Sequence, residues 1–193
     1  MSKNEIRKNG LRLFIAMPLP KSAVQVLEDW CTAGNQRWQF AKWVHPQDLH
    51  ITLQFLGAVD EHVIERIVHV LKEVSRGGAP IDLQFDGVGS FGTKEAPRVL
   101  WAGLGGAIDK LRQLHHSVTA ATSPLGFEPE ERPYRPHITL ARKYRGGEGQ
   151  PFTMNSEPLP PNQWTGEEIV LFQTHMNQSP MYERLHTFTL GQG

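Results

Sequence analysis

The spacing of apolar and polar positions predicts strands and helices that mix without strict alternation. Short apolar or alternating runs predict seven strands, at 11–17, 49–56, 81–88, 98–104, 137–143, 167–176 and 184–190. Apolar residues at helical spacing predict three helices, at 23–33, 61–74 and 107–121. A doubly wound sheet would alternate one strand with one helix, so this order favours an α+β fold.

The residues at the ends of these elements, and the lengths of the loops between them, indicate one domain. Ser22 and Asp60 are predicted to cap the first two helices, and Gly57 is predicted to close the second strand. The longest predicted loop, rich in Gly and Pro, runs from 146 to 166, and its proline cluster is too short for a domain linker. With 193 residues, the chain is expected to fold as a single domain over 1–193.

Composition limits the class of protein. Twenty Lys and Arg balance twenty Asp and Glu, which argues against a protein that coats long nucleic acid by charge alone. Cys31 is the one cysteine, so neither an internal disulfide nor a cysteine-based zinc site can form, and it is expected to be a packing residue. The apolar run 13–17 is too short for a signal sequence, and no run would span a membrane. We expect a soluble, cytoplasmic protein.

The tetrapeptide His-Ile-Thr-Leu occurs twice, at 50–53 and at 137–140, a spacing of 87 residues. Both copies lie in predicted strands, where alternate side chains point to opposite faces. His50 and Thr52 therefore share one face of their strand, and His137 and Thr139 share one face of theirs. A single His-x-Thr is ordinary strand sequence, but two identical copies predict a duplicated lobe that presents both pairs to a common cleft.

Two histidines and two hydroxyls suit acid–base chemistry on a phosphodiester. Imidazole titrates near neutral pH, so one ring can accept a proton from water while the other donates to the leaving oxygen. The threonine hydroxyls can donate hydrogen bonds to phosphate oxygens. No His-Glu-x-x-His zinc motif occurs, and we expect neither a metal nor a cofactor.

The sequence resembles the two-histidine (2H) phosphoesterases. It is most similar to their RNA 2′,3′-cyclic phosphodiesterase branch, historically called 2′-5′ RNA ligase. The similarity includes the paired H-x-T-x motifs and the words around them: RLFIAMPLP at 12–20, KWVHPQDLHITLQFLG at 42–57, RVLWAGL at 98–104, RPHITLAR at 135–142 and FQTHMNQSPMYERLHTFTL near the C-terminus. It spans nearly the whole chain.

This resemblance implies a bilobal fold, in which two intertwined, pseudo-twofold-related lobes each contribute an antiparallel sheet and one motif. Outer helices surround the central cleft. It also implies metal-independent hydrolysis of a terminal 2′,3′-cyclic phosphate to a 2′-phosphomonoester. His50 is then the proton donor to the departing 3′ oxygen, and His137 is the proton acceptor from water. Geometry alone would allow the two roles to be exchanged.

Several flanking residues are further candidates. Phe14 resembles the first-strand aromatic of the family and either stacks on a base or ribose or packs in the core. Arg142 would neutralise phosphate, but strand parity places it opposite His137, so a bulge or strand end is needed. Gln54 is predicted to share the face of His50, where relatives often carry a basic residue. The stretch 132–145 holds five basic residues and no acidic one, which suggests a local grip on a phosphate-bearing end.

Other functions stay open at the level of sequence. The chain could hydrolyse small cyclic nucleotides, or it could ligate RNA ends by the reverse reaction. A non-catalytic nucleotide- or RNA-binding module is disfavoured, because binding alone does not require an acid–base pair. The expected partners are RNA ends or small nucleotides that bear a cyclic phosphate, bound by a monomer with no membrane association.

Overall fold

A computed structural model describes residues 10–146, 152–153 and 158–192. The helices are α1 (Lys21–Asn35), α2 (Glu61–Gly77) and α3 (Ile108–Thr122), with short 3-10 helices η2 (Pro46–Asp48) and η3 (Ser123–Leu125). The strands are β1 (Leu11–Pro18), β2 (Phe40–Trp43), β3 (His50–Val59), β4 (Ile81–Gly92), β5 (Pro97–Gly106), β6 (His137–Tyr144), β7 (Gln163–Gly166), β8 (Glu168–Thr174) and β9 (Tyr182–Thr189).

The strands form one antiparallel sheet whose order reads symmetrically about its centre. The order is β7-β4-β5-β6-β3-β1-β8-β9, and β2 pairs with β6 beside this path. The two motif strands, β6 and β3, meet at the middle through one residue pair, Ile51 with Ile138. The resemblance implied two sheets, whereas this pair joins their hydrogen bonding into one. Ile51 and Ile138 occupy the same place in the two copies of the motif, so the junction lies on the pseudo-twofold axis.

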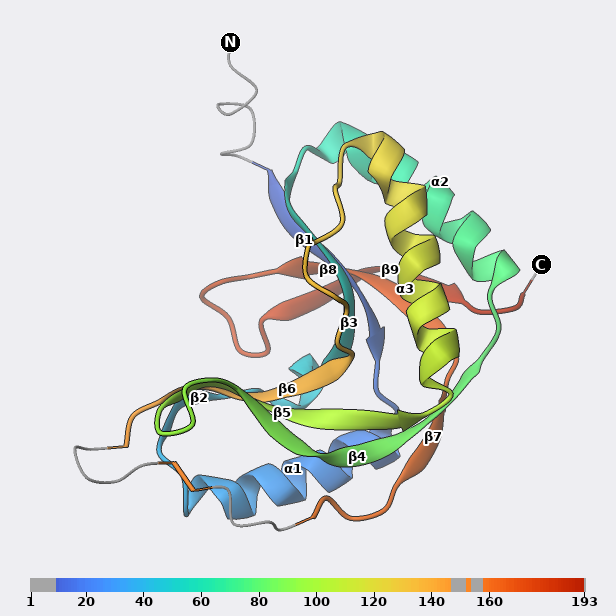
Figure 1. The fold of residues 1–193 in the computed structure, drawn as a ribbon. Coiled ribbons are helices and arrows are strands. Elements are labelled where there is room, and N and C mark those ends of the chain that lie inside the picture. Colours follow the sequence, from blue (N-terminus) through green and yellow to red (C-terminus); the bar gives the residue numbers. More distant parts are fainter. Residues whose placement is uncertain (1–9, 147–151, 154–157, 193) are drawn as a thin grey trace.

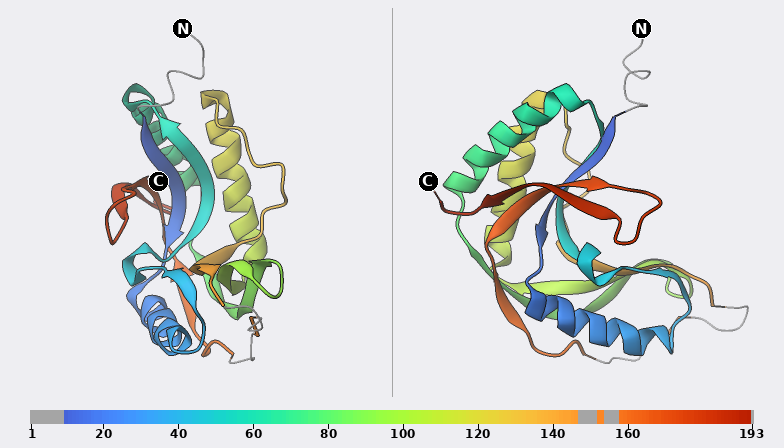
Figure 2. Two further views of the ribbon diagram at one scale, coloured as in Figure 1. Left: turned by 90° about the vertical axis from the view of Figure 1, so that its left-hand side faces the viewer. Right: turned by 180° about the vertical axis from the view of Figure 1, so that it is seen from behind.

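Two lobes meet at this junction (Figures 1 and 2). The first lobe contains β3, β1, β8 and β9, and the adjacent helices α2 and α3 cover it. The second lobe contains β6, β5, β4, β7 and β2, and α1 lies beneath it. The helices cross between the lobes. Helix α1 follows β1 of the first lobe but covers the second lobe, and α3 connects β5 to β6 of the second lobe but packs on β3 of the first.

One apolar core runs through both lobes. It includes Leu27 of α1, Ile67 of α2 and Leu111 of α3, each with no exposed surface, together with Ile51 and Ile138 at the junction. A smaller cluster lies on the other face of the first lobe, where Phe14, Ala16, Val170 and Phe172 are buried. This second cluster forms the floor beside the first motif.

Every predicted helix and strand is present, with differences at the ends. The sequence analysis missed β2 and β7, because four residues are too few for a periodic signal. The prediction that Ser22 caps α1 is wrong, because the helix begins at Lys21 and its N-cap residue is Pro20. Asp60 is the N-cap residue of α2, but its side chain makes no capping hydrogen bond. Part of the predicted 146–166 loop lies outside the described residues.

The structure bears on two expectations from composition, the role of Cys31 and the absence of a membrane span. Burial raises the pKa of the Cys31 thiol to about 12, which keeps it protonated at neutral pH and fits a packing residue. Among the helices of the described residues, none is both long enough and apolar enough to span a membrane.

Candidate active site

The two motifs lie side by side at the centre of the sheet. In an antiparallel pair, the register of Ile51 with Ile138 places His50 across from Thr139 and Thr52 across from His137. Opposed side chains on one face of such a pair lie about 5 Å apart at Cβ. Each histidine thus faces the threonine of the other motif, and all four side chains share one face of the junction.

Each imidazole is held by the backbone carbonyl two residues before it. Nδ1 of His50 donates to the carbonyl oxygen of Asp48 at 2.7 Å, and Nδ1 of His137 donates to that of Arg135 at 2.8 Å. A carbonyl oxygen can only accept, so the proton of each neutral ring must lie on Nδ1. Nε2 is then the nitrogen left for chemistry in both rings. The hydroxyl of Thr52 donates to Nε2 of His50 at 3.0 Å, and within the described residues Nε2 of His137 has no hydrogen-bond partner.

Aromatic rings flank both histidines. The ring centroids of Phe14 and His50 are 4.9 Å apart, and those of Trp101 and His137 are 6.3 Å apart. Phe14 and Trp101 are also separated by 87 residues, so the duplication extends to the neighbouring strands β1 and β5. Phe14 is only 2% exposed and packs between His50, Phe172 and Tyr182. Its ring therefore packs in the floor of the site and contributes only this small exposed area to the cavity that it lines.

A bulge lies at the last residue of each motif, a leucine in both copies. In β3 the pairing with β1 passes from Thr52 to Gln54 while β1 advances by one residue, so Leu53 is the extra residue. In β6 the pairing with β5 passes from Thr139 to Ala141 in the same way, so Leu140 is the extra residue. After a bulge the alternation of side chains is inverted. Arg142 therefore lies on the same face as His137. Regular strand alternation would have placed it on the opposite face, so the bulge brings it to the site.

The first bulge also moves Gln54 away from the cleft. Its side chain is 6% exposed, accepts a hydrogen bond from the Thr122 hydroxyl at 2.6 Å and donates to the carbonyl of Phe127. The prediction that Gln54 shares the face of His50 is therefore wrong. Phe55 takes that place, as the counterpart of Arg142 in the first motif, and it is 58% exposed.

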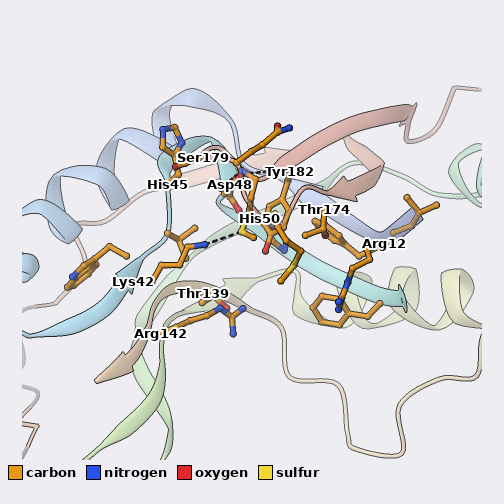
Figure 3. Close-up of a pocket in the computed structure, with 18 of the residues that line it drawn as sticks. Arg12, Lys42, His45, Asp48, His50, Thr139, Arg142, Thr174, Ser179 and Tyr182 are labelled. Atoms are coloured by element: carbon orange, nitrogen blue, oxygen red, sulfur yellow. Dashed lines mark hydrogen bonds between the residues drawn. The ribbon is translucent and has the colours of Figure 1, made fainter. Parts of the chain in front are cut away.

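A cavity of about 430 Å³ opens on the first-lobe side of the junction (Figure 3). Its lining includes Lys42, His50, Phe55, Thr139, Arg142 and Tyr182. Figure 3 shows Arg142 and Thr139 on one wall, with His50 and Tyr182 opposite them. His137 and Thr52 lie beside this cavity and are not part of its lining.

Burial and nearby cations disfavour charge on both imidazoles. Burial lowers the pKa of His50 to about 4, against the raising effect of Asp48, and Arg142 and His137 lower it further. Burial also lowers the pKa of His137, and Arg142 adds to this effect. Both rings are therefore mainly neutral at pH 7 in the free protein. Three cationic side chains, Arg12, Lys42 and Arg142, line the same cavity, which suits an anionic ligand.

Several residues of this site were not predicted from the sequence, among them Arg12, Lys42, Asp48, Phe55 and Tyr182. For Phe55 a signal existed, because it lies 87 residues before Arg142. For Asp48 and Tyr182 the relation is long-range, and nothing in the local sequence indicates it. As for metals, no three His, Cys, Asp or Glu side chains in the described part of the chain gather into a possible ligand group.

Comparison with known families and proteins agrees with this geometry. The family model of the 2′-5′ RNA ligase superfamily matches residues 22–178. An RNA 2′,3′-cyclic phosphodiesterase of Bacillus subtilis is 38% identical over 92% of this chain and 95% of its own. A protein of the same name from Geobacillus stearothermophilus is 36% identical over 92% of this chain, but the match spans only 56% of that longer relative.

Solved structures share the fold. The protein TT0787 of Thermus thermophilus superposes with a TM-score of 0.76 at 27% identity, covering 94% of this chain and 98% of the other. Apo LigT of E. coli superposes with a TM-score of 0.73 at 22% identity, covering 94% and 98%. The bilobal α+β architecture implied by the sequence is confirmed.

Proposed function

Because the chain belongs to the 2′-5′ RNA ligase superfamily, we propose that it is a hydrolase that opens the terminal 2′,3′-cyclic phosphate of RNA to a 2′-phosphomonoester. The observation that carries the proposal is the placement of two imidazoles on one face of the sheet junction, each with Nδ1 held by a carbonyl and Nε2 left for chemistry. The names of the relatives supply the substrate class.

The proposed reaction is an in-line displacement at phosphorus. His137 Nε2 takes a proton from water, and the water oxygen forms a new bond to phosphorus. The bond from phosphorus to the 3′ oxygen breaks, and His50 Nε2 gives that oxygen its proton. The product is a 2′-phosphomonoester beside a free 3′ hydroxyl. In this proposal the hydroxyls of Thr52 and Thr139 and the guanidinium of Arg142 stabilise the phosphate oxygens. The position of Thr139 and Arg142 in the cavity lining supports their part in it.

The substrate itself supplies the charge that the donor requires. His50 is mainly neutral at pH 7 in the free protein, because burial lowers its pKa. A phosphodiester anion in the cavity places a negative charge next to the ring, and an opposite charge within about 4–6 Å favours the imidazolium. Binding is therefore expected to take up a proton, which His50 then delivers to the departing oxygen.

The decisive assay offers the protein an RNA oligonucleotide with a terminal 2′,3′-cyclic phosphate in excess EDTA. We expect complete conversion to the 2′-phosphomonoester, identified by phosphorus NMR. A requirement for added metal, or a 3′-phosphate product, would contradict the proposed mechanism.

Parallel substrates separate the alternatives. Faster turnover of a small cyclic nucleotide than of RNA would favour a cyclic-nucleotide phosphodiesterase. A joined product with a 5′-hydroxyl RNA would indicate the ligase reaction. Tight binding without turnover would leave only a binding module. We further propose that the protein is a cytoplasmic monomer, and sedimentation would test its size.

The pH–rate profile is expected to be bell-shaped. The productive free protein has His50 protonated and His137 neutral, and both pKa values lie below 6.5, so kcat/KM should be highest on the acidic side of pH 6.5. Bound phosphate raises the pKa of His50, so the alkaline limb of kcat should lie at higher pH than that of kcat/KM. A flat profile from about pH 5 to 9 would contradict paired imidazoles.

Removing the exposed ring at the cavity wall is expected to weaken substrate binding. Stacking of a base on an aromatic side chain contributes about 1–3 kcal/mol, so Phe55→Ala should raise KM about 5- to 160-fold with kcat little changed. Phe55 is 58% exposed, so the melting temperature should stay close to wild type. Phe55→Tyr keeps the ring and serves as the matched control. An unchanged KM in Phe55→Ala would exclude this ring from the base site.

A further inference from the structure

The two motifs are identical, so the difference between a donor and an acceptor must come from outside them. The residues two positions before each histidine are the first to differ in charge. Asp48 precedes His50, and Arg135 occupies the equivalent place before His137, again 87 residues away. Both use their backbone carbonyl to hold Nδ1 of the following histidine. Their side chains behave differently.

Asp48 is a buried carboxylate with its hydrogen bonds satisfied. It is 4% exposed, and its two oxygens accept from the backbone N–H of Met181 at 3.1 and 2.9 Å and from that of Tyr182 at 3.1 Å. These amides belong to the end of the loop between β8 and β9 and to the start of β9. The same residue therefore holds His50 with its carbonyl and the β8–β9 hairpin with its side chain.

The hairpin end that Asp48 holds reaches the active site. Met181 and Tyr182 both line the cavity, and the ring of Tyr182 stands edge-on to His50 with centroids 5.2 Å apart. Asp48 thus acts on His50 along two routes, directly through Nδ1 and indirectly through the position of Tyr182. In the other half the side chain of Arg135 is exposed, and the rings against His137 come from Phe91 and Trp101.

We infer that Asp48 is a positioning residue that makes the two halves inequivalent, because it fixes His50 and the β8–β9 hairpin as one unit and places a carboxylate beside only this imidazole. It thereby selects His50 as the ring that carries the proton to the leaving oxygen. This inference rests on the proposed function for its catalytic consequence. Its structural content, the coupling of Asp48 to His50, does not depend on turnover.

Among the charges near His50, that of Asp48 favours the imidazolium. Burial lowers the pKa of His50, while the hydrogen bond to the Asp48 carbonyl and the negative charge of the carboxylate raise it. On β6, the Arg142 guanidinium and, when it is protonated, the His137 ring lower the same pKa. Arg12 of β1 and Lys42 of β2 add positive charge to the lining of the shared cavity. The phenol of Tyr182 from β9 stays neutral, because burial raises its pKa. Asp48 is the only carboxylate among the described residues that line this cavity.

The test removes the negative charge of Asp48 and keeps the size and shape of its side chain. In Asp48→Asn, imidazole NMR should show His50 titrating about one pH unit lower than in wild type, with His137 little changed. The alkaline limb of kcat/KM should move in the same direction, with about a tenfold loss at pH 7. Glu183→Gln is the matched control, because it removes a carboxylate from the same hairpin, where Glu183 pairs with His175 at 2.7 Å. Its titration and rate profile should match wild type.

Asp48→Glu restores the charge and should return the alkaline limb towards its wild-type position. It also carries the test if Asp48→Asn does not fold. An unchanged His50 titration in folded Asp48→Asn, or a displacement as large in Asp48→Glu, would overturn the inference. If wild type fails to turn over RNA cyclic phosphate, the proposed function fails, while the NMR titrations still decide whether Asp48 governs His50.

Discussion

Alanine at His50 or at His137 is expected to lower kcat at least ~10²-fold, the usual scale for losing a general acid or base. The reason is the geometry of the two rings. Each has Nδ1 committed to a backbone carbonyl, so Nε2 is the atom that exchanges a proton. Steady-state kinetics on RNA with a terminal cyclic phosphate measure the loss.

The two variants should differ in their pH dependence. Without the donor, His50→Ala should lose the alkaline limb of the profile, and without the acceptor, His137→Ala should lose the acidic limb. The opposite pattern would exchange the two roles. His62→Ala, on the exposed side of α2, is the matched control and should retain full activity. Near-wild-type turnover in either active-site variant would refute the paired-imidazole mechanism.

Much of this site could be predicted from the repeated tetrapeptide, because its strand conformation and its repetition fix how its side chains are arranged. Alternation in a strand placed histidine and threonine on one face, and the spacing of 87 residues indicated two related lobes. The prediction from side-chain alternation was wrong from the first residue after each motif. Leu53 and Leu140 form bulges, which turn Gln54 inward and bring Arg142 to the cleft. A bulge is set by pairing with the neighbouring strand, so local sequence carries no sign of it.

Long-range contacts account for the rest of what the sequence could not predict. The carboxylate of Asp48 binds amides 133 and 134 residues further along the chain. Where β3 leaves β6, the hydroxyl of Tyr134 donates to the carbonyl of Thr52 at 2.9 Å and so satisfies a backbone acceptor next to the motif. The corresponding gap beside β6 is filled by β2, a strand that sequence analysis missed. These contacts depend on which distant segments the tertiary structure brings together, so local sequence does not indicate them.

Shortening the buried side chain of Ile51 at the junction is expected to destabilise both lobes together. Ile51 has no exposed surface and pairs with Ile138 on the pseudo-twofold axis. Ile51→Ala should reduce the free energy of unfolding by about 2–5 kcal/mol, because it removes buried methylenes and leaves a cavity. Ile51→Val removes less and should cost about 0.5–1.5 kcal/mol. Chemical denaturation gives both values.

The tryptophans make this a test of whether the lobes form one cooperative domain. All five, Trp30, Trp38, Trp43, Trp101 and Trp164, lie in the strands of the second lobe, in α1 beneath it or in the segment that joins them. Ile67 lies in α2 of the first lobe, with no exposed surface, so Ile67→Ala perturbs the first lobe away from the junction. If α1 and α3 tie the lobes together by covering opposite sheets, tryptophan fluorescence and circular dichroism should give the same reduced midpoint in Ile51→Ala and Ile67→Ala. A fluorescence midpoint that stays at the wild-type value while the dichroism midpoint falls would mean that the lobes unfold separately.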